Sequence, residues 1–422
     1  MNRGSRLRAW TQEQKIPEGN HEKRDHEECW IPCSASSFVP QVVVNLTSIK
    51  ENYEYIKAHL KHGTTLSAVV KYDSYGLGAK EISSFLAHEA ECKDFWCTYM
   101  SDAIILRTSG AVPPEANVYY FQGFGPDHVE FVKKYSLIPT INSTFEFAWA
   151  KGKGIPMVIH VDTGFTRLAV RENEMYSIME RLLSENVKYI MSHLSCGDDP
   201  KSHYNIEQKF RFDNLLAEIR KIRPDIKATL AATGGVFLGK NYHYDMVRCG
   251  AFLYGIGVSG HGETPRSVLD VSANVLQTYS VPKGVSVGYG ASFVTERETK
   301  VAVIAIGYAD GIRRSLSNNI GKVLFYSHDN GGNKIILNKA PIIGRISMDL
   351  LACDITNIQE GVVKQGEIAH ILDCYYTIND MAADTQTIPY EILTSMNFRI
   401  PKIYTATTPS DGRLAHALYR SL

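Results

Sequence analysis

The sequence predicts an α/β protein in which a closed (β/α)8 barrel of the TIM type is followed by a mostly-β C-terminal domain. As far as about residue 268, short β-branched runs alternate with helical segments, in units of about 25–40 residues that favour a parallel sheet. A count near eight favours closure of that sheet into a barrel. We therefore expect a flexible extension over 1–37, a barrel over 38–268 and a β domain over 269–422.

The alternating part begins with a strand-like run at 41–46, followed by a helix. The apolar residues of this helix recur at helical spacing: Ile49, Tyr53, Ile56 and Leu60. Ser48 and Glu51 form a capping-box pattern at its start. Further strand-like runs lie at 67–71, 117–121, 137–142, 156–162, 187–194 and 227–232. All but the last of these are followed by a segment with helical character.

The sequence pattern changes after about residue 268, where strand-like runs are separated by Gly, Asn and Asp. Few amphipathic helices interrupt them, which predicts a β domain. These runs are VLQTYSVP, VSVGYGASFVT, TKVAVIAIG, GKVLFYS, NKIILN, APIIGRISMDLLACDIT and EIAHILD.

Composition excludes several classes of function. Lys plus Arg and Asp plus Glu number 45 each, so no overall field favours nucleic acid or an anionic membrane as a partner. The chain has no apolar run long enough to cross a membrane and no secretory signal, so a cytoplasmic location is the default. The eight cysteines are scattered, which predicts free thiols. Cys29 and Cys33 lie near two histidines, but no second ligand pair follows at finger-like spacing, and we expect no metal.

Lys71 is the first candidate for chemistry. It ends a short apolar strand, and catalytic groups lie at that end of barrel strands. Desolvation there would lower its pKa and free its amine for Schiff-base formation. The alternative is a lysine that extends from the strand end into solvent.

The string around Lys71, AVVKYDSYGLGA, resembles the lysine signature of alanine racemases, which depend on pyridoxal 5'-phosphate (PLP). Seven further strings resemble this family in its own order along the chain: VDTGFTRL, SHLS, VRCGAFLYG, VGYGASF, GYADG, GRISMD and PYEILT. Eight strings in order make the resemblance specific, and it covers most of residues 40–405.

The resemblance implies a two-base reaction on PLP. Lys71 would hold the cofactor covalently and exchange a proton with one face of the substrate α-carbon. Tyr289 would serve the opposite face from the partner subunit, so the active form should be a homodimer. His193 and Arg248 would support Tyr289, and Arg248 would also face the pyridine nitrogen of PLP. From the residues alone, Tyr289 is more readily a strand aromatic near a glycine turn, and Arg248 is equally a helix-start or surface arginine.

The resemblance also implies how the phosphate is bound. The matching residues are Tyr75, Thr233, Gly250, Ala251 and Tyr390. The chain departs from the family at Ala232, where the family has asparagine; Thr233 keeps a hydroxyl.

The substrate contacts implied by the resemblance are Arg167, Met348, Asp349 and Tyr308. Many alanine racemases orient the arginine with a carbamylated lysine, but this chain has His160 there. Arg167 would then be positioned by an anion, by water or by the imidazole, and His160 is equally a core histidine. Asp349 could cap a turn and Tyr308 could pack at an edge.

The function implied is interconversion of L-alanine and D-alanine, which would supply D-alanine for peptidoglycan. The alternatives are a racemase with broader substrates, such as serine, lysine or arginine, a PLP-dependent decarboxylase, and a PLP carrier without turnover. The departures at Tyr72, Leu77, His160 and Ala232 keep the broad racemase open. The decarboxylase lacks counterparts to VGYG and GRISMD, and single-barrel carriers lack the C-terminal domain.

Overall fold

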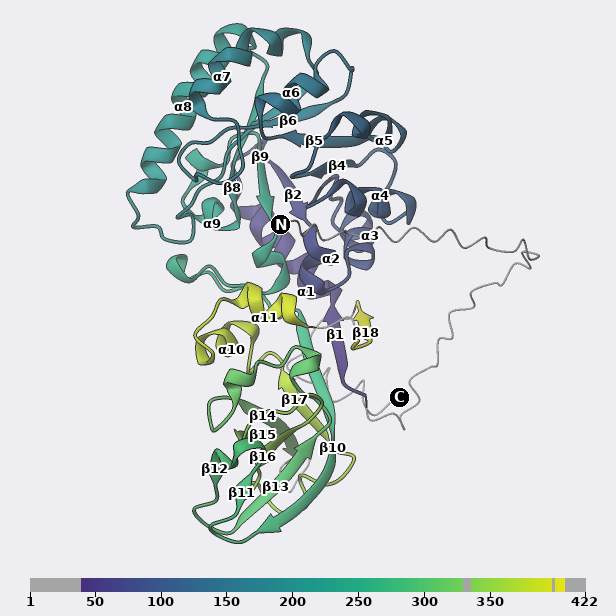
Figure 1. Cartoon of the computed structure of the whole chain (residues 1–422), viewed down its shortest axis with the longest axis vertical. Coiled ribbons are helices and arrows are strands. Elements are labelled where there is room, and N and C mark those ends of the chain that lie inside the picture. The colour runs from purple at the N-terminus through teal and green to yellow at the C-terminus, as the bar shows by residue number, and fades with distance from the viewer. Residues whose placement is uncertain (1–38, 329–334, 397–398, 407–422) are drawn as a thin grey trace, which may run out of the picture. The chain divides into compact units, whose positions relative to one another are not determined.

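The computed structural model describes residues 39–328, 335–396 and 399–406 (Figure 1). The extension expected over 1–37 lies outside the described residues, as do Cys29 and Cys33. In the described part of the chain, no group of His, Cys, Asp and Glu is arranged to hold a metal ion. No helix in those ranges is both long and apolar enough to cross a membrane.

Eight parallel strands close into a barrel, which confirms the predicted fold class. In order they are β2 (Thr65–Val69), β3 (Asp94–Cys97), β4 (Asn117–Tyr120), β5 (Leu137–Ile141), β6 (Met157–His160), β7 (Val187–Met191), β8 (Lys227–Ala232) and β9 (Met246–Cys249). The register Leu66↔Val247 between β2 and β9 closes the ring. Most of these strand residues are buried, as in a sheet covered on both faces.

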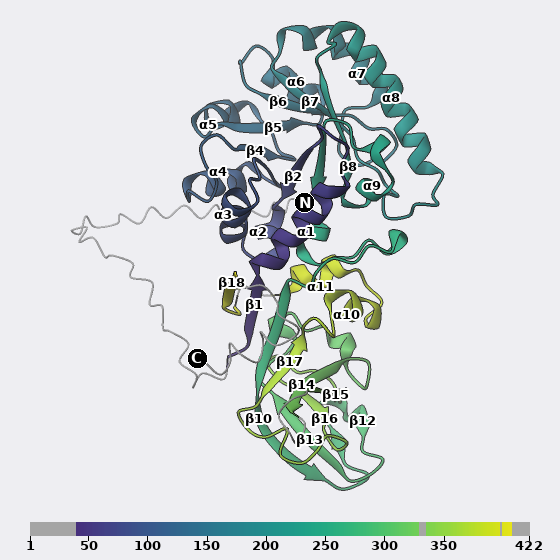
Figure 2. The same cartoon turned by 180° about the vertical axis from the view of Figure 1, so that it is seen from behind.

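Helices surround the barrel strands, as Figures 1 and 2 show from opposite sides. They are α1 (Leu46–His59), α3 (Ala79–Glu89), α4 (Met100–Thr108), α5 (Val129–Lys134), α6 (Thr144–Ala150), α7 (Glu172–Ile178), α8 (Tyr204–Ile222) and α9 (Thr233–Phe237). The capping box expected at Ser48 and Glu51 is wrong: Asn45 caps α1 by accepting a hydrogen bond from the Ser48 amide at 3.0 Å. The helix therefore begins earlier than its polar pattern suggested.

The strand-like run at 41–46 forms β1 (Gln41–Asn45), but this strand is not part of the barrel. It pairs antiparallel with β10 (Leu269–Val281) and parallel with β18 (Lys402–Thr405). Its side chains alternate between buried and half-buried, which is typical of a sheet with one covered face. The first strand of the described residues thus belongs to the C-terminal sheet.

The C-terminal part is mostly β, as predicted. Its main sheet has the order β13-β16-β15-β14-β17-β10-β1-β18, and β10 also pairs with β13. The remaining strands are β11 (Ser286–Val287), β12 (Phe293–Val294), β13 (Thr299–Ile304), β14 (Lys322–His328), β15 (Ile335–Ile343), β16 (Leu351–Asp354) and β17 (Ile368–Leu372). Two helices follow: α10 (Ile378–Asp384) and α11 (Pro389–Ser395).

Short 3₁₀ turns connect many of these elements. They are η1 (Pro126–His128), η2 (Met179–Ser184), η3 (Lys240–Tyr242), η4 (Ala251–Tyr254), η5 (Ser259–His261), η6 (Tyr289–Ala291), η7 (Tyr308–Asp310) and η8 (Arg314–Leu316).

A buried ion pair inside the β domain gives a test of its stability. His370 Nδ1 lies 3.1 Å from Asp270 Oδ2, and the Tyr326 ring packs edge-on against the imidazole. Burial lowers the pKa of His370, but the charge and hydrogen bond of Asp270 together with the charge of Asp373 raise it more, so that the net shift is upward. His370→Gln should lower the free energy of unfolding by about 3–5 kcal/mol, because it leaves a buried carboxylate without its cation.

Because the pKa of His370 is raised in the folded protein, the stabilisation by this ion pair decreases as the pH rises. The contribution of the pair is complete below the unfolded-state pKa of histidine, near 6.5, and is lost as the pH rises through the higher folded-state pKa. Urea unfolding of both proteins between pH 6 and 9 should show the gap between wild type and variant shrinking with pH. A gap that stays constant over this range would contradict the account.

Candidate active site

The C-terminal ends of the barrel strands gather most of the residues that the sequence singled out. Lys71 follows β2, His160 ends β6, His193 follows β7, Thr233 follows β8, and Arg248 lies in β9. Parallel barrel strands point these ends the same way. The barrel topology therefore brings these five residues to one mouth.

Lys71 is the first residue of α2 (Lys71–Gly76), a turn whose backbone is mostly in the left-handed conformation. Four consecutive non-glycine residues there have left-handed dihedral angles, with φ between 52° and 59°: Tyr72, Asp73, Ser74 and Tyr75. Such a conformation costs about 1–2 kcal/mol per residue, so its surroundings must hold it. The Asp73 carboxylate accepts a hydrogen bond from the Ala79 amide at 2.7 Å, and the buried Tyr75 ring packs on Tyr254. Apart from the glycines that follow it, nothing in the sequence indicates this turn.

The environment of Lys71 suits a nucleophilic amine. The side chain remains accessible from the mouth, while surrounding protein atoms desolvate it. This burial, together with the positive charge of Arg167, lowers the pKa of Lys71. A lower pKa leaves more of the amine unprotonated, which is the form that attacks a carbonyl. The amine is therefore partly desolvated, although the residue as a whole remains exposed.

Arg248 is a buried cation, only 3% exposed, on strand β9. The alternative of a surface or helix-start arginine is wrong. Its guanidinium donates to Thr229 Oγ1 at 2.6 Å and to the Ser192 carbonyl at 2.8 Å. Burial lowers its pKa to about 9, so it stays protonated near neutral pH. In the described part of the chain, no carboxylate forms an ion pair with it, so its charge is available to a bound acceptor.

His193 contacts Arg248, with Nδ1 3.4 Å from an Arg248 nitrogen. Burial, and next the charge of Arg248, hold the pKa of His193 well below its usual range. The imidazole is therefore neutral. Its ring also packs against Phe165, with the two ring centroids 5.2 Å apart.

The five residues expected at the phosphate lie together. The Thr233 hydroxyl accepts a hydrogen bond from the Gly250 amide at 3.2 Å. A Cβ atom on Gly250 would come within 2.5 Å of the Tyr75 hydroxyl, so only glycine fits there. The Tyr75 and Tyr390 ring centroids are 6.2 Å apart, and Ala251 follows Gly250 at the start of η4.

This set of groups fits PLP. An amine of lowered pKa suits its aldehyde, the cluster of hydroxyl and amide groups around Gly250 suits its phosphate, and a buried guanidinium suits its acceptor ring nitrogen.

Asp198 is a neighbour of the phosphate residues that sequence reasoning missed. A Cβ atom on Gly234 would collide with the Asp198 carboxylate, and the negative charge of Asp198 contributes to the raised pKa of Tyr390. Burial raises the pKa of Asp198 itself. A carboxyl that protonates more readily is easier to place beside a phosphate.

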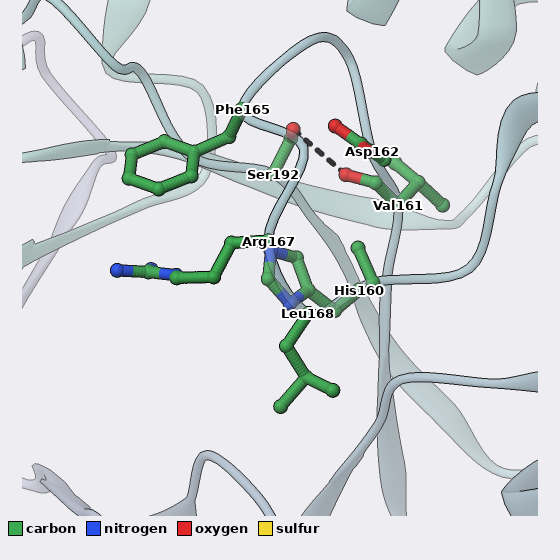
Figure 3. Close-up of a pocket in the computed structure, with 8 residues that line it drawn as sticks. His160, Val161, Asp162, Phe165, Arg167, Leu168 and Ser192 are labelled. Atoms are coloured by element: carbon green, nitrogen blue, oxygen red, sulfur yellow. Dashed lines mark hydrogen bonds between the residues drawn. The ribbon is translucent and has the colours of Figure 1, made fainter.

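His160 and Arg167 line one pocket, together with Asp162, Phe165 and Ser192 (Figure 3). His160 Nδ1 lies 2.9 Å from Asn142 Oδ1. Burial, and then the nearby arginines, lower the pKa of His160 to about 3. His160 is thus a neutral group where the family has a carbamate.

Tyr308, Met348 and Asp349 of the C-terminal domain lie on two adjacent turns, and Tyr289 lies on a third turn, η6. The Tyr308 amide donates to the Ser347 carbonyl at 3.0 Å, which places Tyr308 beside the loop that carries Met348 and Asp349. Asp349 accepts a hydrogen bond from Arg399 at 2.8 Å. Tyr308 and Met348 are largely exposed, as is Tyr289 at 65%. Within the described ranges, the aromatic ring that faces the Lys71 amine is that of Tyr75, 5.8 Å away.

Sequence comparison identifies both parts of the chain. Residues 44–257 match the family "Alanine racemase, N-terminal domain", and residues 268–404 match "Alanine racemase, C-terminal domain". The chain belongs to the alanine racemase family. Its members are PLP-dependent isomerases, and a match in both domains speaks against a decarboxylase or a carrier.

Curated and solved relatives agree with this assignment. An alanine racemase of Brucella abortus is 35% identical over 386 residues, covering 86% of this chain and 93% of that protein. A catabolic alanine racemase of Agrobacterium fabrum is 34% identical over 376 residues, covering 86% and 91%. The crystal structure of alanine racemase from Bartonella henselae, with covalently bound pyridoxal phosphate, superposes with a TM-score of 0.77 at 34% identity, covering 87% and 99%.

Proposed function

We propose that this protein interconverts L-alanine and D-alanine with PLP, using Lys71 and Tyr289 as bases on opposite faces of the substrate. The observation that carries the proposal is the desolvated amine of Lys71 at the same barrel mouth as a buried arginine and a cluster of phosphate donors. When bound, PLP withdraws electrons from the substrate and makes its α-hydrogen acidic.

Lys71 would act on one face of the α-carbon. Its lowered pKa lets the amine take up a proton from the substrate and return it near neutral pH. The left-handed turn fixes where the lysine leaves the strand, and thereby which face it reaches.

Tyr289 would act on the other face, from a second copy of the chain. Its exposed ring and the exposed side chains of Met348 and Tyr308 are apolar surface that one chain leaves uncovered. Seating this surface on the barrel mouth of the partner would bring a hydroxyl opposite Lys71. We therefore propose a homodimer with two shared sites.

Arg248 and His193 would set the electronic state of the site. Arg248 stays protonated near neutral pH and donates hydrogen bonds without giving up its proton, so a ring nitrogen facing it remains unprotonated. That arrangement restrains carbanion delocalisation and thus side reactions. The neutral His193 holds the guanidinium in place without cancelling its charge.

Arg167 and the Met348 backbone amide would bind the substrate carboxylate, and Tyr308 and Asp349 would border the same space. D-alanine made this way would serve peptidoglycan synthesis. The relative of Agrobacterium fabrum is named catabolic, and a catabolic role is the other candidate use.

The proposal is tested by racemisation of L-alanine, L-serine, L-lysine and L-arginine, followed by circular dichroism with purified protein and added PLP. Signal loss mainly with alanine is the expected result. Comparable loss with the larger substrates would move the assignment to a broad-spectrum racemase, and no loss with any of them would overturn it.

A further inference from the structure

We propose that Phe165 is a positioning residue that holds Arg167 through its ring face and leaves the arginine's charge free for the substrate carboxylate. This inference rests on the proposed function. The sequence analysis left open whether an anion, water or the His160 imidazole positions Arg167. We assign that role to the neutral ring of Phe165.

The contact is direct. The Arg167 guanidinium carbon lies 4.2 Å from the centroid of the Phe165 ring, and Figure 3 shows the arginine side chain running alongside that ring. A cation at this distance over an aromatic face is attracted by the ring quadrupole. Phe165 is supported in turn by the neutral His193 ring. The stack therefore connects Arg167 to His193, which contacts Arg248.

The loop that carries Phe165 is fixed by its own hydrogen bonds. Asp162 Oδ1 accepts from the Gly164 amide at 2.9 Å and from the Thr166 amide at 3.1 Å. The Tyr204 hydroxyl donates to the Gly164 carbonyl at 2.8 Å. These contacts hold the ring in place before any substrate arrives.

The charges around Arg167 leave it unneutralised. Within the described ranges, no carboxylate forms an ion pair with Arg167; Asp162, in the same loop, is paired with Arg171. The His160 side chain in the same pocket is neutral and faces Asn142. An anionic partner would hold Arg167 but would also oppose the binding of a second anion.

Stacking on the Phe165 ring holds Arg167 in place and also leaves its charge unneutralised. A guanidinium is planar and its five N–H groups lie in its plane, so a ring against its face blocks none of them. The edge stays open for a bidentate contact with a carboxylate. The Phe165 ring thus fixes the direction of Arg167 while its binding capacity is kept for the substrate.

The test compares Phe165→Leu, which removes the ring, with Phe165→Tyr, which keeps it. Phe145→Leu, on α6 and 75% exposed, is the matched control for the same chemical change elsewhere. We expect Phe165→Leu to raise KM for L-alanine roughly 2- to 30-fold with a smaller change in kcat, the range that a cation–π contact supports. Phe165→Tyr and the control should stay close to wild type.

A readout that needs no turnover completes the test. Propionate, which is alanine without its amino group, is titrated into each protein by calorimetry, and crystal structures locate Arg167. The stack predicts weaker propionate binding and a displaced Arg167 in Phe165→Leu, with both restored in Phe165→Tyr. Wild-type affinity and an unmoved Arg167 in Phe165→Leu would overturn the inference, even in a protein that racemises alanine. Loss of racemisation in the wild type would instead contradict the proposed function.

Discussion

Replacing Lys71 with alanine should abolish racemisation and remove the visible absorbance of lysine-bound PLP. The rate should fall by about 10⁴-fold or more, because the variant loses the covalent anchor as well as acid–base catalysis worth about 10²–10⁴-fold. The phosphate residues around Gly250 are untouched, so the variant should still bind PLP reversibly. Absorbance spectra before and after borohydride treatment, with circular dichroism assays, measure both effects.

Lys80→Ala is the matched control, because Lys80 is an exposed lysine on the neighbouring helix α3. It should keep the absorbance and the activity. A Lys71→Ala protein whose absorbance remains and is abolished by borohydride would show that another amine carries the cofactor, and would refute the assignment of Lys71.

Replacing Tyr289 with phenylalanine should lower racemisation in both directions by about 10²–10⁴-fold while the cofactor absorbance persists. The change removes one hydroxyl from an exposed side chain, so folding and cofactor binding have no reason to change. Racemisation needs proton transfer on both faces, and therefore the L-to-D and D-to-L rates should fall together. Both are followed by circular dichroism at saturating alanine.

Tyr279→Phe, at an exposed position on β10, controls for the loss of a surface hydroxyl. It should leave both rates unchanged. Near-normal turnover of Tyr289→Phe in both directions would remove Tyr289 from the mechanism.

The fold was predictable wherever a segment has the apolar spacing of a helix or the β-branched composition of a strand. α1 and α8 carry helical spacing, and most barrel strands read as β-branched runs. Strands β3 and β9 were missed because each is short and neither is a β-branched run: they read DFWC and MVRC. β1 was assigned to the barrel part of the chain because its neighbours in the sequence are barrel elements; its pairing with β10 is a long-range contact that local pattern does not encode.

The site was predictable where a residue sits in a string that resembles the family. Lys71, Arg248 and the phosphate residues were found this way, and the structure places them at one barrel mouth. The left-handed turn was missed because its four residues carry no glycine. Phe165 and Asp198 were missed because their roles come from contacts with other strand ends.

The central claim is that each site takes Lys71 from one chain and Tyr289 from the other, and mixing two inactive variants tests it most directly. Lys71→Ala and Tyr289→Phe proteins are unfolded together, refolded at equal concentration with PLP and assayed. Random pairing makes half of the dimers mixed, and each mixed dimer holds one intact site, so about a quarter of wild-type activity should return. If both residues acted within one chain, no mixed dimer would contain an intact site, and a mixture as inactive as its two components would contradict the account.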